Sequence, residues 1–404
     1  MSRKDRLRPA AAAVIVAAAL GIALLHAGLL PWGAAGAPAA NGGTAMGLDS
    51  PDLAEARPLA ATVVGRILPV ETPLRQTMAE SALAPVARGF RHQWPAIYAT
   101  ARFEGEALIA AFDDAINRYR IVIDDGRAHV IDRPGKQAFR FSDLGAGTHS
   151  VRLDKISESS GVGGFAGFLV PPGGTALDAP KPSARQIEFI GDSDTVGYGN
   201  TASKRNCVGD EAFLLTDTQR SYGPQVARRF GADYQIIAKS GIGVVRNYGG
   251  ADPGTSMPRL YPRVLPADPA PYDNRNWTPQ IIVVALGTND FAPPVGAGER
   301  WADQVALRAD FERGQARLLA DLRKRNPKAY LLIAIFEGFD ATYAAATRSA
   351  AAAAAAGDSR IGVIGFPRLG YRGCHWHPSR RDHKRIADSL ADYLEARPAL
   401  WQGR

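Results

Sequence analysis

Hydrophobic and polar positions follow two different patterns along this chain. From residue 185 onward, near-continuous apolar runs alternate with longer segments of helical periodicity, and such runs are typical of strands buried on both faces. We expect strands at 187–190, 234–238, 281–286, 330–336 and 361–366, and helices at 221–230, 301–325, 342–356 and 379–395. This alternation predicts an α/β domain over 185–404, with a parallel sheet flanked by helices.

Residues 58–172 show short alternating segments separated by turn signals. Segments 101–105, 120–126 and 147–153 alternate or run apolar, and the dipeptide Asp125-Gly126 is a strong hairpin signal. Many short strands at regular spacing predict an antiparallel β-sandwich. The aromatic side chains that attract attention here are Trp94, Phe103 and Tyr119, which we interpret as sandwich core rather than a sugar platform. Residues 173–184, rich in Pro and Gly, are expected to link the two domains.

The amino end has the composition of an export signal. Four basic residues lie within positions 1–9, and an apolar stretch follows from Ala10 to Leu30. Residues 1–37 therefore predict a signal peptide or, since the apolar stretch is long enough to cross a bilayer, an uncleaved membrane anchor. Either reading places the folded part in the periplasm or outside the cell. Residues 38–57, rich in Ala, Gly, Pro and Asn, predict a disordered linker.

The length and composition are those of a globular protein large enough for two domains. The 404 residues are 46% hydrophobic and 22% charged, with a net charge of +8. The Arg and Lys residues are scattered, and no basic stripe is interleaved with aromatic residues. We therefore expect a solvated surface and no nucleic-acid partner, with membrane contact only through the amino-terminal segment. The sequence does not indicate an oligomeric state.

Four polar blocks follow four of the expected strands of the second domain. They are Gly191-Asp192-Ser193, Lys239-Ser240-Gly241, Gly287-Thr288-Asn289-Asp290 and the segment 373–379, which reads Gly-Cys-His-Trp-His-Pro-Ser. The carboxyl ends of parallel strands meet at one edge of a sheet, so these blocks are expected to lie together. Ser193 is the candidate nucleophile. Its base would be His377, which lies in a loop just before a helix, whereas His383 falls inside that helix and is expected to be structural.

With these blocks, the chain resembles the SGNH (GDSL-type) hydrolases over about residues 58–400. The segment Gly-Tyr-Gly-Asn after Ser193 and the Cys-His-Trp-His-Pro-Ser ending resemble the two-domain carbohydrate esterases of family 2. The resemblance implies a jelly roll for the first domain and an oxyanion hole made by the backbone N–H groups of Ser193 and Gly241 and the side-chain amide of Asn289. A missing Cβ at Gly241 lets substrate approach the backbone. No metal or organic cofactor is implied.

The orientation of His377 departs from the usual SGNH pattern. The position three before it, where most members have Asp, is Cys374, and the position two before it is His375. No local carboxylate is present to hold the imidazole. The family 2 branch also contains Ser-His dyads oriented by a main-chain carbonyl, and we expect the carbonyls around His375 and Trp376 to serve here. Trp376 either lines the acyl or sugar pocket or packs the loop.

The two cysteines, Cys207 and Cys374, are expected to form a disulfide because an exported protein meets an oxidising compartment, the alternative being two free thiols.

Together, the polar blocks, the export signal and the family resemblance predict an exported serine esterase that removes O-acetyl groups from a carbohydrate. The resemblance implies a plant polysaccharide such as xylan or glucomannan. The alternatives are a generic GDSL lipase or aryl esterase, and a carbohydrate-binding protein without catalysis.

Overall fold

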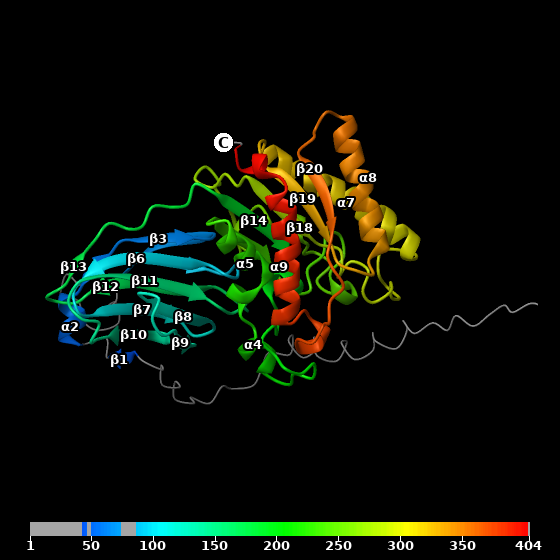
Figure 1. The fold of residues 1–404 in the computed structure, drawn as a ribbon. Helices are drawn as coiled ribbons and strands as arrows, with labels where there is room; N and C mark the ends of the chain where they lie inside the picture. The colour runs from blue at the N-terminus through cyan, green and yellow to red at the C-terminus, as the bar shows by residue number, and fades with distance from the viewer. Residues whose placement is uncertain (1–42, 47–49, 74–85, 403–404) are drawn as a thin grey trace, which may run out of the picture.

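The computed structural model describes residues 43–46, 50–73 and 86–402 (Figure 1), so the expected signal or anchor at 1–37 lies outside the described residues. Within these ranges the chain forms a β-sandwich lobe beside an α/β lobe (Figure 1). No helix of the described part is both long and apolar enough to span a bilayer.

The sandwich consists of two antiparallel sheets, as the short alternating segments predicted. The first has strands β1 (Thr44–Met46), β10 (Gly135–Phe141), β7 (Leu108–Asp114), β12 (Gly163–Val170), β5 (Val86–His92) and β4 (Ile67–Pro73), with β2 (Arg57–Leu59) beside β12. The second has β13 (Thr175–Ala176), β6 (Tyr98–Glu104), β11 (Thr148–Lys155), β8 (Arg118–Ile123) and β9 (His129–Asp132), with β3 (Ala61–Val64) beside β6. Trp94, Phe103 and Tyr119 are buried in the core, so the core interpretation holds.

Part of the expected linker is structured instead. Strand β1 pairs with β10, and helix α2 spans Pro51–Glu55. Leu53 and Ala56 are buried in one apolar cluster with Ile109 and Leu169. The prediction of a disordered linker over 38–57 is therefore wrong for these residues. Two isolated apolar side chains docking on a finished sheet leave no periodic pattern in the sequence.

The α/β lobe is built on a five-stranded parallel sheet in the order β15 (Asp233–Ala238), β14 (Gln186–Gly191), β18 (Ile281–Ala285), β19 (Tyr330–Ile335) and β20 (Ile361–Gly365). Phe189 points toward the face covered by α5 (Tyr222–Arg229) and α9 (Arg380–Glu395), in one cluster with Val226 and Ile386. Ile190 faces the opposite core, which contains residues of α7 (Gln304–Arg325) and α8 (Asp340–Ala355). The predicted alternation of strands and helices is confirmed.

The two lobes share one continuous core and are joined by polar contacts at their junction. Arg66 of the sandwich is buried, with its Nη2 3.5 Å from Oε2 of Glu188 on β14. Trp94 donates its indole N–H to the carbonyl of Val264 at 3.1 Å. That carbonyl belongs to a hairpin of β16 (Arg263–Leu265) and β17 (Asp268–Pro271), which follows α6 (Met257–Leu260) and which the sequence did not predict.

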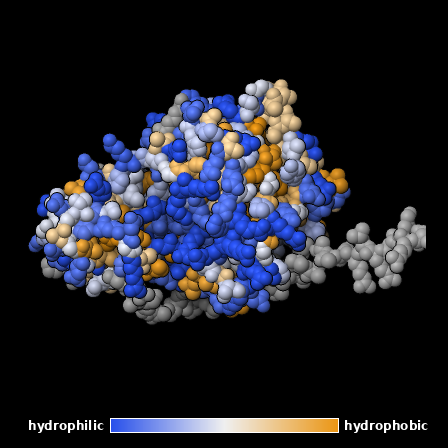
Figure 2. Space-filling model, viewed as in Figure 1, coloured by the Kyte–Doolittle hydropathy of each residue, from blue (hydrophilic) through white to orange (hydrophobic). Residues whose placement is uncertain are grey.

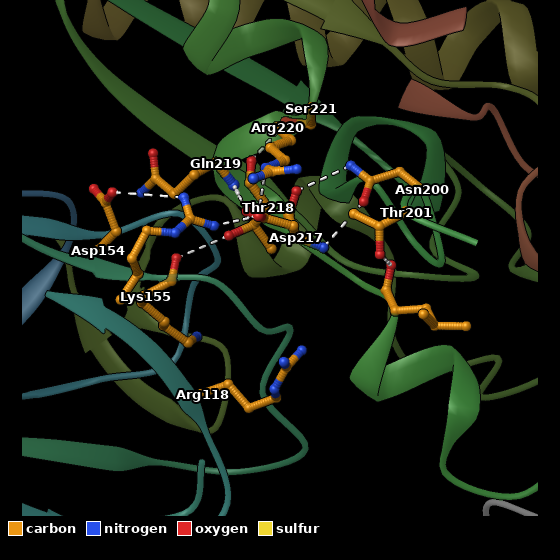
Figure 3. Close-up of polar contacts among 12 residues, drawn as sticks. Arg118, Asp154, Lys155, Asn200, Thr201, Asp217, Thr218, Gln219, Arg220 and Ser221 are labelled. Carbon is orange, nitrogen blue, oxygen red and sulfur yellow. Dashed lines mark hydrogen bonds and ion pairs between the residues drawn. The ribbon is translucent and has the colours of Figure 1, made fainter. Parts of the chain in front are cut away.

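A second set of junction contacts centres on Asp217 (Figure 3). Its carboxylate accepts a hydrogen bond from Arg120 of the sandwich. The adjacent Thr218 donates its hydroxyl to the carbonyl of Lys155 at 2.9 Å, and the Asp217 N–H donates to the Oδ1 atom of Asn200 at 3.0 Å. Since Asn200 belongs to the block that follows Ser193, these contacts connect the sandwich to the loop beside the candidate nucleophile.

The face seen in Figure 2 is hydrophilic over α5 and α9. Its exposed cations include Arg229, which contacts Glu395 at 2.8 Å, and Lys384, which contacts Asp388 at 2.7 Å. These paired charges fit the interpretation of the basic residues as a solvated surface.

Candidate active site

Ser193 lies at the turn between strand β14 and the short helix α3 (Ser193–Val196). Asp192 caps this helix, and its carboxylate accepts a hydrogen bond from the backbone N–H of Asp194. Gly197 ends the helix in the left-handed region, at φ 84°, a conformation that favours glycine. The turn presents Ser193 at the carboxyl edge of the sheet, where 8% of its surface remains exposed.

His377 contacts Ser193 directly. Its Nε2 atom lies 2.9 Å from Oγ of Ser193, and its Nδ1 atom lies 2.9 Å from the carbonyl oxygen of Cys374. A carbonyl can only accept, so Nδ1 carries the proton and Nε2 is left to accept the serine proton. Burial lowers the pKa of His377 to about 4, against the opposing effect of the bond to Cys374. The imidazole is therefore neutral, and able to act as a base, at neutral pH.

The acceptor for His377 is a main-chain carbonyl, as expected, and it is that of Cys374, directly before the pair His375 and Trp376 around which it was expected. His375 and Trp376 both have left-handed backbones, with φ of 51° and 63°, and the chain turns so that the Cys374 carbonyl meets the ring. His375 instead contacts the Tyr198 hydroxyl at 3.0 Å and the Cys207 carbonyl at 2.8 Å.

The helix that follows is fixed at its start by a capping box. Ser379 and Asp382 bond reciprocally, so the carboxylate of Asp382 is used within the helix and at Gly370. His383 is buried within α9 and stacks on Tyr222, at 6.1 Å between ring centroids. Neither Asp382 nor His383 is part of the contact between Ser193 and His377.

Two of the three expected oxyanion donors are open. Among the residues that the structure describes, neither the backbone N–H of Ser193 nor that of Gly241 has a hydrogen-bond acceptor. Gly241 has φ 76°, and a Cβ there would meet nothing within 4 Å, so the backbone faces free space. Ser193 is buried and Gly241 is half-buried, and an approaching oxyanion would accept hydrogen bonds from both N–H groups.

Asn289, the third expected donor, is already engaged. Its Nδ2 atom lies 3.1 Å from Oδ2 of Asp192 and 3.0 Å from the carbonyl of Ile242. It therefore ties the first block to the second, and would have to give up one bond to reach an oxyanion. Asp192 also accepts from the Thr288 hydroxyl. These contacts make Asp192 a residue that orders the loops around the nucleophile, and burial raises its pKa to about 6.

Cys207 and Cys374 form the expected disulfide beside this site. Cys374 is fully buried, and its carbonyl is the one that holds His377. The disulfide therefore restrains the residue that orients the catalytic base. No cluster of three or more His, Cys, Asp or Glu side chains in the described ranges could hold a metal ion.

Comparison with known proteins places this arrangement in a family. Residues 85–180 match the family described as carbohydrate esterase 2 N-terminal, and residues 189–394 match the GDSL-like lipase/acylhydrolase family. An acetylxylan esterase/glucomannan deacetylase of Cellvibrio japonicus (strain Ueda107) is 39% identical over 347 residues, which cover 85% of this chain and 93% of that protein. The chain belongs to carbohydrate esterase family 2.

Solved structures of carbohydrate esterases share both domains of this family 2 esterase. One, described for the divergent catalytic and non-catalytic binding functions of its active site, superposes with a TM-score of 0.76 at 37% identity and covers 85% of this chain and 99% of its own. A family two esterase from Clostridium thermocellum in complex with cellohexaose has a TM-score of 0.69 at 26% identity, covering 84% and 100%. This chain is accordingly a carboxylic ester hydrolase.

Trp376 of this family 2 esterase directly precedes His377 in the chain. Its side chain is 39% exposed, and the guanidinium of Arg205 lies over its ring at 3.5 Å from the centroid. One face of the indole thus packs on the loop, in line with the packing alternative, while part of the side chain remains open to solvent.

Two residues around the site were not singled out from the sequence. The ring of Tyr198 packs against that of His377, with 4.6 Å between centroids, although Tyr198 belongs to a block already singled out. Glu158 comes from the sandwich domain, and its carboxylate accepts two hydrogen bonds from Ser240 in the second block. No motif surrounds Glu158, so no signal in the sequence could have found it.

Proposed function

We propose that this family 2 esterase removes O-acetyl groups from carbohydrates through an acetyl-enzyme on Ser193. One observation carries the proposal. The Ser193 hydroxyl lies 2.9 Å from a neutral imidazole whose other nitrogen is fixed by a carbonyl. This geometry lets His377 take the serine proton as the oxygen attacks.

The reaction proceeds in two halves. Ser193 Oγ bonds to the acetyl carbonyl carbon while its proton passes to His377, and the N–H groups of Ser193 and Gly241 donate to the oxyanion. The bond to the sugar oxygen then breaks, and His377 returns the proton to that oxygen. In the second half a water molecule, deprotonated by His377, attacks the acetyl-serine and releases acetate, which restores the hydroxyl.

The substrate class is inferred from the relatives. One is named an acetylxylan esterase/glucomannan deacetylase, and another was solved with cellohexaose bound. We therefore expect an acetylated plant polysaccharide such as xylan or glucomannan. The exposed part of Trp376 gives an apolar surface beside the base on which a sugar ring or acetyl group packs.

The test is acetate release from acetylated xylan, acetylated glucomannan and an aryl acetate, comparing the wild type with Ser193→Ala. Release from the glycans by the wild type, lost in the variant, supports the proposal and ranks the substrates. Release from the aryl acetate alone favours a generic esterase. Glycan binding by both proteins without acetate release favours a binding protein that has lost catalysis.

We also propose that the enzyme works in the periplasm or outside the cell. The Cys207–Cys374 disulfide is typical of oxidising compartments, and the basic and apolar residues at the amino end are those of an export signal. Fractionation of cells followed by amino-terminal sequencing tests this. A reduced protein that retains residue 1 in the cytoplasm would contradict it.

A further inference from the structure

Glu158 reaches from the sandwich domain into the catalytic domain. It lies in the loop between β11 and β12, and its side chain is partly buried at the domain junction. Its Oε1 atom accepts the backbone N–H of Ser240 at 2.7 Å, and its Oε2 atom accepts the hydroxyl of Ser240 at 2.5 Å. Both carboxylate oxygens are thus directed at one residue of the other domain.

Ser240 directly precedes Gly241, whose N–H is one of the two open oxyanion donors. The segment forms a tight turn, in which the Ile242 N–H donates to the carbonyl of Lys239 at 3.2 Å. The Gly241 carbonyl is held at its far side by the N–H of Tyr248 at 2.9 Å. Because Gly241 itself has no side chain, its direction depends on the residues on either side.

The loop that carries Glu158 is itself well held. Ser157 and Ser159 both donate hydroxyls to Oδ1 of Asn117, at 3.0 and 2.8 Å. Lys155 donates its ammonium to the carbonyl of Trp94 at 2.9 Å and to the Ser159 hydroxyl at 2.5 Å. Glu158 is therefore presented from a fixed support, as a residue that positions another must be.

Burial and hydrogen bonding act in opposite directions on Glu158. Burial is the larger influence and raises its pKa, while the two bonds from Ser240 and the nearby side chains of Lys155 and Lys239 favour the charged form. Hydrogen bonds to a charged acceptor are stronger than neutral ones.

We propose that Glu158 is a positioning residue through which the sandwich domain completes the oxyanion hole, by holding Ser240 so that the Gly241 N–H points at the reacting carbonyl. The inference rests on the proposed esterase function. It makes the sandwich a working part of the active site and not only a neighbour or a sugar-binding attachment. In this role Glu158 acts through its two hydrogen bonds to Ser240 and not on a reacting atom.

Three variants separate this role from others. Glu158→Ala removes both acceptors. Glu158→Gln keeps both contacts without charge, because its amide oxygen accepts the Ser240 N–H and its amide nitrogen donates to the Ser240 hydroxyl. Glu106→Ala is the matched control, since Glu106 is an exposed carboxylate of the same domain.

The measurements are kcat and KM for an aryl acetate, the rate at which an organophosphate inactivates Ser193, and the melting temperature. We expect kcat of Glu158→Ala to fall by about 10- to 100-fold with KM nearly unchanged, because the loss is felt where the oxyanion forms. Its inactivation rate should fall in parallel, since the phosphoryl oxygen occupies the same hole. Glu158→Gln should stay within about fivefold of wild type, and Glu106→Ala should match it.

The proposal is overturned if Glu158→Ala retains wild-type kcat, or if it raises KM alone, which would indicate substrate binding. It is also overturned if Glu158→Gln is as slow as Glu158→Ala, since the charge and not the contact would then matter. If Glu158→Ala does not fold, Glu158→Asp, which withdraws the carboxylate by one methylene, replaces it with the same expectations. A wild type that neither cleaves the aryl acetate nor reacts with the organophosphate refutes the esterase function itself, which is a separate outcome.

Discussion

Removing the disulfide between Cys207 and Cys374 should lower both stability and turnover, for two separable reasons. The first concerns the unfolded chain, because the two residues are 167 positions apart. In the chain-entropy model a cross-link over that length stabilises the folded state by about 5 kcal/mol. We expect the double variant Cys207→Ser/Cys374→Ser to lose up to about that much free energy of unfolding, measured by urea denaturation.

The second reason concerns the dyad. The carbonyl that holds His377 belongs to Cys374, and without the bridge this residue is fixed by backbone bonds such as its own N–H to the Gly199 carbonyl at 3.2 Å. A misplacement of about 1 Å in a catalytic group costs on the order of 100-fold in rate. The kcat of the folded double variant should therefore fall by up to about 100-fold, while KM changes little.

Initial rates of acetate release, taken well below the unfolding midpoint of the variant, separate the two effects. Wild-type enzyme reduced with dithiothreitol should behave like the double variant. A kcat equal to that of the oxidised wild type would show that the Cys374 carbonyl keeps its place without the bridge. An unchanged urea midpoint would refute the stability argument.

Three further predictions follow from single groups. His377 has a pKa of about 4 because of burial and must be neutral to take a proton, so kcat/KM should hold as the pH falls and be lost only near pH 4; a midpoint near 6.5 would contradict this. Asn289→Ala should lower kcat by about 100-fold or more in steady-state assays, through loss of an oxyanion donor or of the tie between two blocks, and an unaltered kcat would exclude both roles. Gly199→Ala places a Cβ 2.7 Å from the sulfur of Cys374 and should cost about 1–3 kcal/mol in thermal unfolding. Gly209→Ala, at the same φ of 55° but with nothing within 4 Å, isolates the backbone strain, so equal losses would rule out the clash.

Local sequence patterns were sufficient to predict the strands of the parallel sheet and the residues of the catalytic dyad. Near-continuous apolar runs placed the five strands of the parallel sheet within one or two residues, and their polar ends brought Ser193 and His377 together. A main-chain carbonyl around His375 was expected to hold His377, but that it is the carbonyl of Cys374 depends on the left-handed backbone at His375 and Trp376. The presence of a histidine followed by a tryptophan does not by itself predict such a turn.

Contacts between the domains lay beyond sequence reasoning. Glu158 and Ser240 are 82 positions apart, and Arg66 and Glu188 are 122 apart. Each pair becomes adjacent only when the sandwich has docked on the parallel sheet, and each residue alone has the composition of an ordinary loop or strand. Tertiary packing and not local preference determines such pairs.

The main-chain acceptor at Cys374 has a consequence for how this enzyme varies. A peptide oxygen is supplied by whichever amino acid occupies the position, so no side-chain exchange deletes it, and an alanine scan of the loop would reveal a serine and a histidine with no third member. The hydrogen bond to His377 depends instead on the conformation of the backbone. Insertions, deletions or a change of the turn geometry would break it. Motif searches that require an acidic residue shortly before the catalytic histidine would classify this chain as inactive, although the Cys374 carbonyl holds its imidazole in place.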